Sequence, residues 1–442
     1  MKKVVLIGAN HAGTAAANTI LDNSDLDLTI FDANDNISYL GCGTALAVGK
    51  QIDGFGGLFY SSKEDLEKKG AKVYMESPVS YIDFENKEVT ASTKDGDLKV
   101  KYDDLILATG SLPIIPNIKG LDLDGVHGLK FYQDGTHLYD ELADESIKKI
   151  AVIGAGYIGV EIAEAIERRG KHCLLFEAAS TSLANYYDEW FAQDMDEVLK
   201  NHNIELHYQE MVQELTGESH VQGIVTNKGN YEVDLVIFAI GFRANTELGK
   251  ETLEIGVGNA YSVDKHQQTS LKNVYAIGDC ATIFNNASQQ KAYIALATNA
   301  VRSGVVAAFN VMGTSLESNG VQGSNGICIY DYKMVSTGLS VHAATKLGFD
   351  VEHTDFEDWQ KPAFIKENNQ KVKIRIVYDK QTRRVLGAQM ASYLDISMGI
   401  HMFSLAIEQQ VTIDDLKLLD IFFLPHFNQP YNYITMAALS AK

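Results

Sequence analysis

The stretch KIAVIGAGYIG, residues 149–159, decides the fold of this chain. An apolar strand pattern runs up to Gly154, and an amphipathic helix pattern begins directly after it. Gly154, Gly156 and Gly159 give the full G-x-G-x-x-G spacing. The first glycine permits a tight turn, the second lets the backbone approach a pyrophosphate, and the third lets the helix pack closely on the strand. The stretch therefore predicts a βαβ unit that binds a dinucleotide.

The residue that ends the following strand indicates which dinucleotide binds. Glu177 lies 23 residues after Gly154, where a carboxylate can accept hydrogen bonds from both ribose hydroxyls. A 2′-phosphate would be repelled there, and residues 178–182 contain no Arg or Lys to receive it. The pattern therefore favours NADH over NADPH.

A weaker copy of the same unit opens the chain. The strand Lys3–Ile7 stops at Gly8, and the following GANHAG, residues 8–13, has Asn10 in place of the middle glycine. Asp32 follows Gly8 by 24 residues, at the end of the next strand, in position to contact a ribose. Two such units in one chain predict two dinucleotides.

Two later strand ends favour FAD for this first unit. Asp279 follows Gly278 after a short strand, where a carboxylate can hydrogen-bond the ribityl chain of a flavin. Thr109 and Gly110 form a second strand-end turn, at which the chain returns beside the cofactor. The order and spacing of these short motifs predict FAD in the first unit.

The chemistry is expected at Cys42, in the stretch ISYLGCG at residues 37–43, which should run along the flavin. A helix pattern begins just after Cys42, and a helix N-terminus is expected to lower the pKa of its thiol. Position 47 is Ala47, so no C-x-x-x-x-C disulfide forms, and the thiol must cycle through sulfenic acid or a mixed disulfide. His11 is the expected proton donor or hydrogen-bond partner near Cys42. The plainer alternatives are a small buried hydrophobe for Cys42 and a loop-capping residue for His11.

Composition narrows the class of protein. The 58 acidic and 38 basic residues give a net charge of −20, which argues against nucleic acid or an anionic membrane as partner. The N-terminal apolar run is too short for a signal peptide, and no apolar stretch approaches the roughly 18 residues of a membrane span. The four cysteines lack paired spacing and no zinc pattern is present, so a cytoplasmic protein without a metal is expected.

The strand and helix patterns predict an α/β fold with two Rossmann-like dinucleotide-binding domains, for FAD and NAD, and a C-terminal α+β domain. The FAD-binding domain is expected to be discontinuous, at residues 1–115 and 246–322, with the NADH-binding domain at 116–245 between its parts. Residues 323–442 form the C-terminal domain. Within this domain the expected elements are strands at 373–378 and 385–390 and helices at 396–408 and 412–419.

The chain resembles the single-cysteine branch of the pyridine nucleotide–disulfide reductase superfamily, which contains the bacterial NADH oxidases and NADH peroxidases. The likeness spans nearly the full chain and is greatest to the water-forming NADH oxidases. The strings that carry it, in family order, are Gly8–Thr14, Ser38–Leu46, Leu107–Pro113, Gly154–Glu161, Gly241–Thr246, Val274–Ala281, Ala295–Arg302 and Phe422–Tyr433.

The resemblance implies FAD as cofactor, NADH as substrate and a homodimer formed through the C-terminal domain. It matches Cys42 to the family's peroxidatic cysteine, with His11 beside it. Tyr157 matches an aromatic residue over the nicotinamide side of the flavin, and Glu161 matches the pocket glutamate. The partner subunit is expected to close the site with Phe423, Pro425, His426 and Phe427.

The sites for the two dinucleotides follow from the motifs and the resemblance together. The residues expected to bind FAD are Gly8, Asn10, Ala12, Gly13, Asp32, Cys42, Thr109, Gly110, Asp279, Ala297 and Thr298. The residues expected to bind NADH are Gly154, Gly156, Tyr157, Ile158, Gly159, Glu161, Glu177 and Gly241.

The function implied is an oxidase that reduces O₂ to water with two NADH, while Cys42 cycles between thiolate and sulfenic acid. Three alternatives stay open: an NADH peroxidase acting on H₂O₂, a coenzyme A disulfide reductase, and a flavin redox sensor or electron-transfer module. Val301 favours the oxidase, because the peroxidases more often have a basic residue there. Phe423 stands where the coenzyme A disulfide reductases have Tyr, which disfavours that alternative. Two further departures from the family are Ala244 in place of Pro and Tyr431 in place of Trp.

Overall fold

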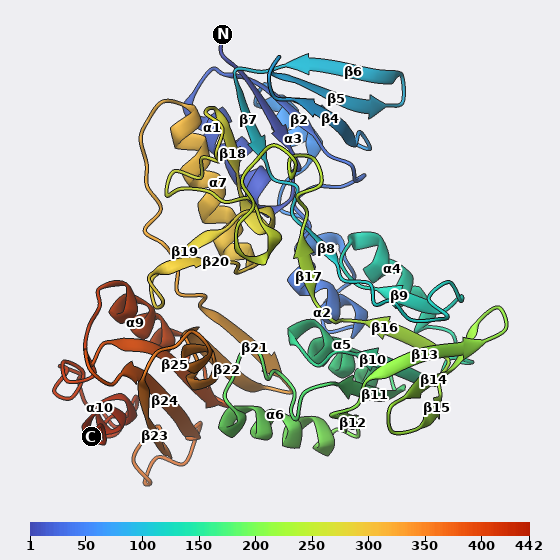
Figure 1. The fold of residues 1–442 in the computed structure, drawn as a ribbon. Helices are drawn as coiled ribbons and strands as arrows, with labels where there is room; N and C mark the ends of the chain where they lie inside the picture. Colours follow the sequence, from blue (N-terminus) through green and yellow to red (C-terminus); the bar gives the residue numbers. More distant parts are fainter.

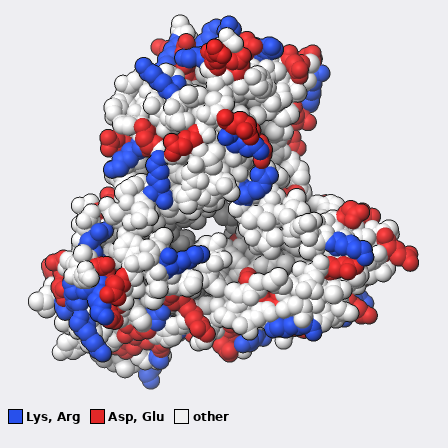
Figure 2. All heavy atoms as spheres, in the orientation of Figure 1, with Lys and Arg blue, Asp and Glu red and all other residues white.

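The computed structural model describes residues 1–442 as three lobes around a central hollow (Figures 1 and 2). The first lobe is built on a five-stranded parallel sheet. Helices α1 (His11–Asn23) and α7 (Ala297–Val311) pack together on it, and a β-carbon on Gly304 would lie 2.4 Å from the Ala12 carbonyl oxygen. A glycine is therefore what lets these two helices touch. The strands, from edge to edge, are β18 (Val274–Ala276), β7 (Asp104–Leu107), β1 (Lys3–Ile7), β2 (Asp27–Phe31) and β3 (Lys72–Tyr74).

The second lobe has a parallel sheet of the same kind. Ile150 and Val152 of its central strand are fully buried, which explains the continuous apolar run of that strand. The strands, from edge to edge, are β12 (Glu205–Tyr208), β11 (His172–Glu177), β10 (Lys149–Ile153), β16 (Leu235–Phe238) and β9 (Val126–Gly128). The lobe also contains α4 (Tyr132–Glu141), α5 (Tyr157–Arg168), α6 (Glu189–Asn201), β13 (Val212–Gly217), β14 (Val221–Thr226) and β15 (Asn230–Glu232).

The third lobe has an antiparallel five-stranded sheet. Its core is formed by residues such as Ile376, Met390 and Phe403, all of which are fully buried. The strands, in sheet order, are β21 (Asn325–Ile329), β22 (Tyr332–Gly338), β25 (Val385–Ser392), β24 (Lys371–Asp379) and β23 (Val351–Trp359). Its helices are α8 (Val341–Lys346), α9 (Ser397–Glu408) and α10 (Tyr433–Leu439).

The chain passes between the first and second lobes along a two-stranded antiparallel ribbon. In this ribbon β8 (Ser111–Pro113) pairs with β17 (Phe242–Ala244), and both strands run between the two lobes in Figure 1. Ala244 is buried opposite Ser111, so strand pairing holds the position at which the family has Pro. The remaining elements are α2 (Thr44–Val48), α3 (Lys63–Lys68), β4 (Val79–Asp83), β5 (Glu88–Thr93), β6 (Gly96–Lys101), β19 (Ile283–Asn285) and β20 (Gln290–Ala292).

The predicted α/β fold is confirmed, but one predicted helix is wrong. Residues 413–418 form consecutive turns instead, and Thr412 forms an isolated β-bridge with Arg384. The Asp415 carboxylate accepts hydrogen bonds from the backbone N–H and the hydroxyl of Thr412, at 2.9 and 2.6 Å, as it would at the start of a helix. The neighbouring Asp414, however, is engaged by Arg383 from a different part of the domain. These tertiary contacts override the local helix pattern.

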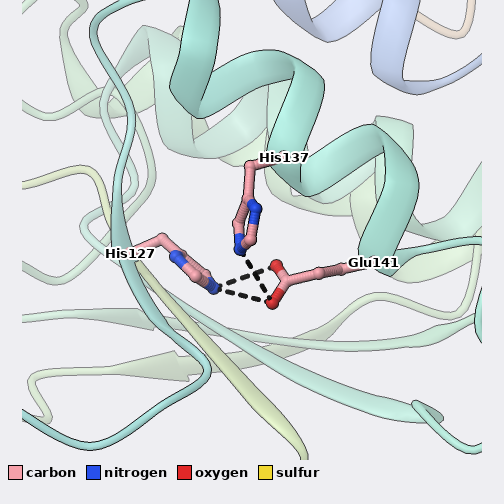
Figure 3. A group of neighbouring side chains, drawn as sticks. All are labelled: His127, His137 and Glu141. Carbon is pink, nitrogen blue, oxygen red and sulfur yellow. Dashed lines mark hydrogen bonds and ion pairs between the residues drawn. The ribbon is translucent and has the colours of Figure 1, made fainter.

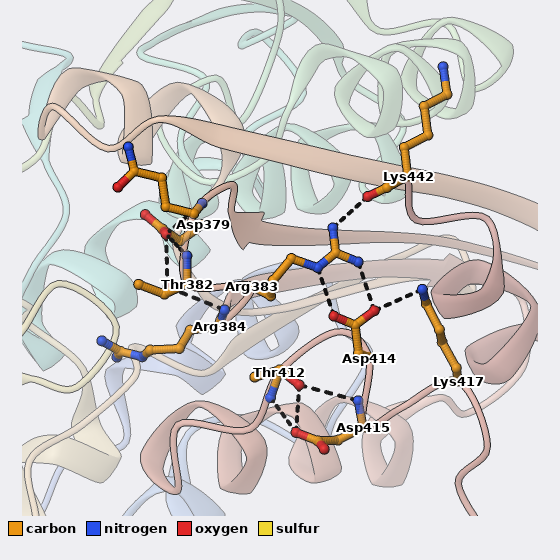
Figure 4. Close-up of polar contacts among 10 residues, drawn as sticks. Asp379, Thr382, Arg383, Arg384, Thr412, Asp414, Asp415, Lys417 and Lys442 are labelled. Carbon is orange, nitrogen blue, oxygen red and sulfur yellow. Dashed lines mark hydrogen bonds and ion pairs between the residues drawn. The ribbon is translucent and has the colours of Figure 1, made fainter.

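Arg383 also holds the end of the chain (Figure 4). Its Nε and Nη2 donate to the two carboxylate oxygens of Asp414 at 2.7 and 2.8 Å, and its Nη1 donates to the backbone carbonyl of Lys442. Lys417 approaches the same carboxylate at 2.8 Å. The two basic partners hold the pKa of Asp414 well below its usual range.

The outer surface carries both signs of charge. Figure 2 shows acidic and basic side chains interspersed over the visible face, without a large area of one sign. No helix of the chain combines the length and the apolar character needed to cross a membrane.

Candidate active site

The first glycine-rich turn is built by close backbone approaches. Gly8 has a φ of +98°, and a β-carbon there would lie 2.2 Å from the Ala108 carbonyl oxygen. A β-carbon on Gly13 would lie 1.9 Å from the Gly8 carbonyl oxygen. Asn10 precedes α1 with a φ of −85°, which any residue adopts, so this position does not require glycine. The departure at Asn10 therefore leaves the turn intact.

In each of the two βαβ units, the carboxylate at the end of the second strand accepts hydrogen bonds from the backbone of the glycine-rich turn. Asp32 accepts backbone N–H groups from Ala9 and Asn34, at 2.7 and 2.8 Å. Burial raises the pKa of Asp32, and these two hydrogen bonds oppose the increase. Glu177 repeats the arrangement, accepting N–H groups from Ala155 and Ala179 at 2.8 and 2.9 Å. Both carboxylates that were predicted to contact a ribose thus lie beside a glycine-rich turn.

The second glycine-rich turn leaves open space where the motif requires it. β-Carbons on Gly154 and Gly159 would lie 2.5 and 1.8 Å from backbone carbonyl oxygens, so both positions exclude side chains. At Gly156 a β-carbon would meet no atom closer than 3.8 Å, the nearest being on Tyr186. A pyrophosphate can approach the backbone in this open space, which fits a bound dinucleotide.

Three side chains from separate segments meet at the strand end that is expected to contact the flavin. Asp279 accepts a hydrogen bond from Ser111 at 2.8 Å, and Lys130 lies 3.7 Å from the same carboxylate. Lys130 also donates to Ser111 at 2.8 Å. Lys130 belongs to no motif in the sequence and was not predicted, because only the fold brings the end of β9 next to Asp279.

Two further features of this region fit a flavin. A β-carbon on Gly110 would meet no atom within 4 Å, so there is open space beside the Thr109–Gly110 turn. Thr109 itself donates to the backbone carbonyl of Asn245 at 2.6 Å. Ala297 and Thr298 are exposed at the start of α7, which has no side-chain cap and therefore offers free N–H donors. The residues present fit the polar edge of an FAD molecule.

Cys42 opens into a cavity of about 350 Å³ between the lobes. The thiol is free and exposed, in a single 3₁₀ turn just before α2. Glu161 and Glu164 of α5 reach the cavity from the second lobe, and Cys328 of β21 reaches it from the third. The other lining residues are Ala45, Leu46, Gln51, Gly326, Ile327, Lys333, Val335, Asp395, Ile396 and Ser397.

The expected low pKa of the Cys42 thiol is wrong for this structure. The residue is exposed at the cavity but partly withdrawn from bulk water, and this partial burial raises the pKa. The negative charge of Glu161 raises it further, and a local backbone hydrogen bond opposes both effects. The helix after Cys42 has only five residues, so its dipole is small. Burial, together with nearby Glu164, raises the pKa of Glu161 to about 7. Glu161 can therefore change its protonation state near neutral pH.

His11 lies at the first residue of α1, but its polar contact is with Tyr60 rather than with Cys42. It is also absent from the lining of the cavity. Burial and the positive charge of Lys130 lower the pKa of His11, while Asp279 raises it. In this structure His11 is therefore paired with Tyr60, and the charges of Asp279 and Lys130 are close enough to affect its pKa. Its role beside Cys42 stays a prediction.

Tyr157 connects the second and third lobes. Its hydroxyl contacts the side-chain oxygen of Asn325 on β21 and donates to the hydroxyl of Tyr187 at 3.1 Å. Burial raises the pKa of Tyr157 well above its usual value, so the hydroxyl stays protonated. The ring packs on Tyr186, with ring centroids 4.4 Å apart. The side chain thus reaches from the first residue of α5 to β21 of the third lobe.

The C-terminal segment presents apolar side chains to solvent in the single subunit. Phe422, Phe423 and Phe427 are 65%, 47% and 56% exposed, and His426 is also exposed. The segment is nevertheless held in place, because Gln360 donates to the backbone carbonyl of Phe427 at 2.8 Å. A fixed apolar segment of this kind is typical of a surface that another protein covers.

The remaining cysteines have the expected surroundings. Cys173 and Cys280 are buried in the cores of the two nucleotide-binding lobes and behave as packing residues. Cys328 lies on β21, as expected, but its side chain is exposed in the cavity of Cys42.

Comparison with known proteins identifies the family. The model of the pyridine nucleotide-disulphide oxidoreductases matches residues 2–304, which is more than half of the chain. The chain belongs to this family. The model of the family's dimerisation domain matches residues 325–432. The resemblance drawn from the motifs is therefore confirmed.

Relatives within the family are similar over their whole length. The chain is 58% identical to the NADH oxidase of Lactococcus lactis subsp. cremoris, with all of both chains covered. It is 53% identical to the NADH oxidase of Streptococcus pyogenes serotype M6, again with all of both chains covered. The water-forming NADH oxidase from Lactobacillus brevis, solved with NADH bound, matches with a TM-score of 0.96 at 36% identity, covering 100% of this chain and 98% of that one.

Proposed function

We propose that this protein is an FAD-dependent NADH oxidase that reduces O₂ to water with two NADH. The observation that carries the proposal is the environment of Cys42, an exposed thiol in a cavity shared with Glu161. Ala47, where a second redox cysteine would stand, is fully buried. A lone thiol of this kind can be oxidised by a peroxide to sulfenic acid but cannot close an intrachain disulfide. The similarity to bacterial NADH oxidases supports the same acceptor.

The two glycine-rich turns would hold the two dinucleotides. FAD would lie over the Gly8 turn, with Asp32 toward its ribose and Asp279 toward its ribityl chain. NADH would lie over the Gly154 turn, with Glu177 toward its ribose and Tyr157 above the nicotinamide. When bound, FAD supplies the redox chemistry, because it takes hydride from NADH and passes electron pairs to the acceptor and to oxidised Cys42.

The residues of the chain complete the conversion to water. The Cys42 thiolate attacks one oxygen of a peroxide, so that an S–O bond forms, the O–O bond breaks and hydroxide leaves. The sulfur is thereby oxidised to sulfenic acid, and the hydroxide takes up a proton to become water. Glu161, with a pKa of about 7, can accept the thiol proton or supply the proton to the leaving hydroxide.

NADH peroxidase is the second candidate, because the same cavity would serve a peroxide that arrives from solution. Val301 lies at an exposed position of α7, 40% accessible, and its apolar side chain favours the oxidase. Coenzyme A disulfide reduction and a non-catalytic redox role are less well supported, because no residue of the cavity specifically favours either function.

The experiment is to measure NADH consumed per O₂, with an assay for H₂O₂ alongside. The wild-type protein is expected to consume two NADH per O₂ and release no peroxide. Cys42→Ser should consume one NADH per O₂ and release H₂O₂, whereas Cys328→Ser, in the same cavity, should still form water. If Cys42→Ser still forms only water, the proposed role of Cys42 is wrong. Loss of NADH on addition of H₂O₂, without uptake of O₂, would indicate the peroxidase.

The assembly proposed is a homodimer in the cytoplasm. The partner subunit would close the cavity with the segment that contains Phe423, Pro425, His426 and Phe427. The proposed domain boundaries are residues 1–115 and 246–322 for FAD, 116–245 for NADH and 323–442 for dimerisation.

A further inference from the structure

A cluster of two histidines and a glutamate lies at the edge of the NADH-binding lobe, outside the proposed active site. His127 is on the edge strand β9, and His137 and Glu141 are one turn apart on α4. Figure 3 shows the two imidazoles and the carboxylate pointing toward one another. The Nε2 atom of His127 lies 3.1 and 2.9 Å from the two carboxylate oxygens, and the Nε2 atom of His137 lies 3.3 Å from one of them.

We propose that these three side chains form a zinc site. Imidazole nitrogens and a carboxylate oxygen are typical zinc ligands, and two histidines with one glutamate form a known ligand set. With metal–ligand distances of about 2.0–2.1 Å, tetrahedral ligand atoms lie roughly 3.3 Å apart. The nitrogen–oxygen distances of 2.9–3.3 Å are close to this spacing, and the ligand atoms of the three side chains all lie within 4.8 Å of one another.

One oxygen of the carboxylate lacks a well-aligned hydrogen bond. The Oε2 atom of Glu141 is buried and accepts no hydrogen bond, although the His127 nitrogen is only 2.9 Å away. A buried carboxylate oxygen without a hydrogen bond is costly, and coordination of a cation would satisfy it. His127 and Glu141 are about 80% buried, at 22% and 19% exposure of their side chains, whereas His137 is 60% exposed. Two of the three side chains, His127 and Glu141, are therefore held in the interior, and the site is open to solvent beside His137.

The position of the site gives the ion a structural role. Residues from β9 and from α4 would be joined through the metal, closing the edge of the second parallel sheet. The open side, next to His137, leaves room for water as the fourth ligand. The zinc expected here could not be recognised from the sequence, because the two histidines are ten residues apart and one of them is on a strand.

The test is direct localisation of zinc in the FAD-loaded protein. Crystals grown with Zn²⁺ are expected to give an anomalous peak about 2.0–2.2 Å from the Nε2 atoms of His127 and His137 and from an oxygen of Glu141. A map with no peak at this position at saturating Zn²⁺ would overturn the proposal. The crystal locates the ion even if the exposed cysteines bind zinc elsewhere.

Equilibrium dialysis and thermal unfolding test the same site in solution. Because the exposed His137 side chain supports little packing, His137→Ala should fold normally while its zinc affinity at this site falls at least about 10-fold. Zinc should raise the midpoint of thermal unfolding of the wild type but not that of His137→Ala or Glu141→Gln. His172→Ala is the matched control, because His172 faces Glu205 at 3.0 Å in a similar exposed pair. Equal loss of zinc in the His137 and His172 variants, or none in either, would contradict the proposal.

Discussion

His11 and Tyr60 form a stacked, hydrogen-bonded pair at the start of α1. The Nδ1 atom of His11 lies 2.9 Å from the hydroxyl oxygen of Tyr60, and the two rings are parallel with centroids 5.9 Å apart. Burial raises the pKa of Tyr60 to about 12, so the hydroxyl keeps its proton at neutral pH. A protonated hydroxyl can donate to Nδ1, which would leave the proton of neutral His11 on Nε2.

The first prediction is that Tyr60→Phe raises the pKa of His11. A hydrogen bond donated to Nδ1 is compatible only with the neutral imidazole, so its loss favours protonation. The measurement is a pH titration of the ring nitrogens of His11 by NMR. The proportion of His11 with its proton on Nε2 should also fall in the variant.

A fall in the pKa of His11 in the Tyr60→Phe variant would contradict this assignment and show that the Tyr60 hydroxyl accepts instead. Tyr81→Phe is a suitable control, because Tyr81 is 61% exposed and lies on β4, in a different part of the first lobe from α1. The control should leave the titration of His11 unchanged.

The second prediction concerns the electrostatic effect of Glu161 on Cys42. Because the carboxylate raises the pKa of the thiol, Glu161→Gln should lower that pKa and increase the thiolate fraction. The difference should appear mainly above about pH 7, where Glu161 is ionised in the wild type. The rate of alkylation of Cys42 by iodoacetamide, followed against pH by mass spectrometry, measures this change. Glu167→Gln on the same helix should leave the rate unchanged, and an identical profile for Glu161→Gln would refute the coupling.

The glycine turns and the carboxylates that anchor them could be predicted from the sequence, because each depends on local backbone geometry. A β-carbon at Gly8 or Gly154 would lie within 2.5 Å of a backbone carbonyl oxygen. Only glycine fits at these positions, which is why the motif can be read from the sequence. Lys130 and Tyr60 could not be predicted, since only tertiary packing brings them to Asp279 and His11. The prediction of a low pKa for the Cys42 thiol failed for a related reason, because both the burial that raises this pKa and the charge of Glu161 that adds to it arise only in the folded protein.

The third prediction is a pH-dependent loss of stability through Glu161. Its pKa is about 7 in the folded protein against 4.5 for the exposed group, so the folded state holds the proton more tightly. The contribution of Glu161 to the free energy of unfolding is therefore greatest below pH 4.5. It declines as the pH rises to about 7 and stays low above that. The full difference is on the order of 3.4 kcal/mol. Glu161→Gln lacks this decline, so the midpoint of its thermal unfolding should exceed that of the wild type more at alkaline than at acidic pH. A constant gap between the two proteins would show that Glu161 does not titrate in this range.

The fourth prediction is that Glu177→Gln weakens the preference for NADH. The carboxylate accepts two backbone N–H groups and would also bind the ribose, and the amide cannot accept at both of its terminal atoms. The KM for NADH should rise about 10-fold, the effect of losing one hydrogen bond to a charged group. The KM for NADPH should rise less, because the amide no longer repels a 2′-phosphate. Steady-state kinetics with both dinucleotides check this, with Glu232→Gln, 92% exposed on the same lobe, as the control. If the two KM values rise by the same factor, Glu177 holds the turn but does not discriminate between the dinucleotides.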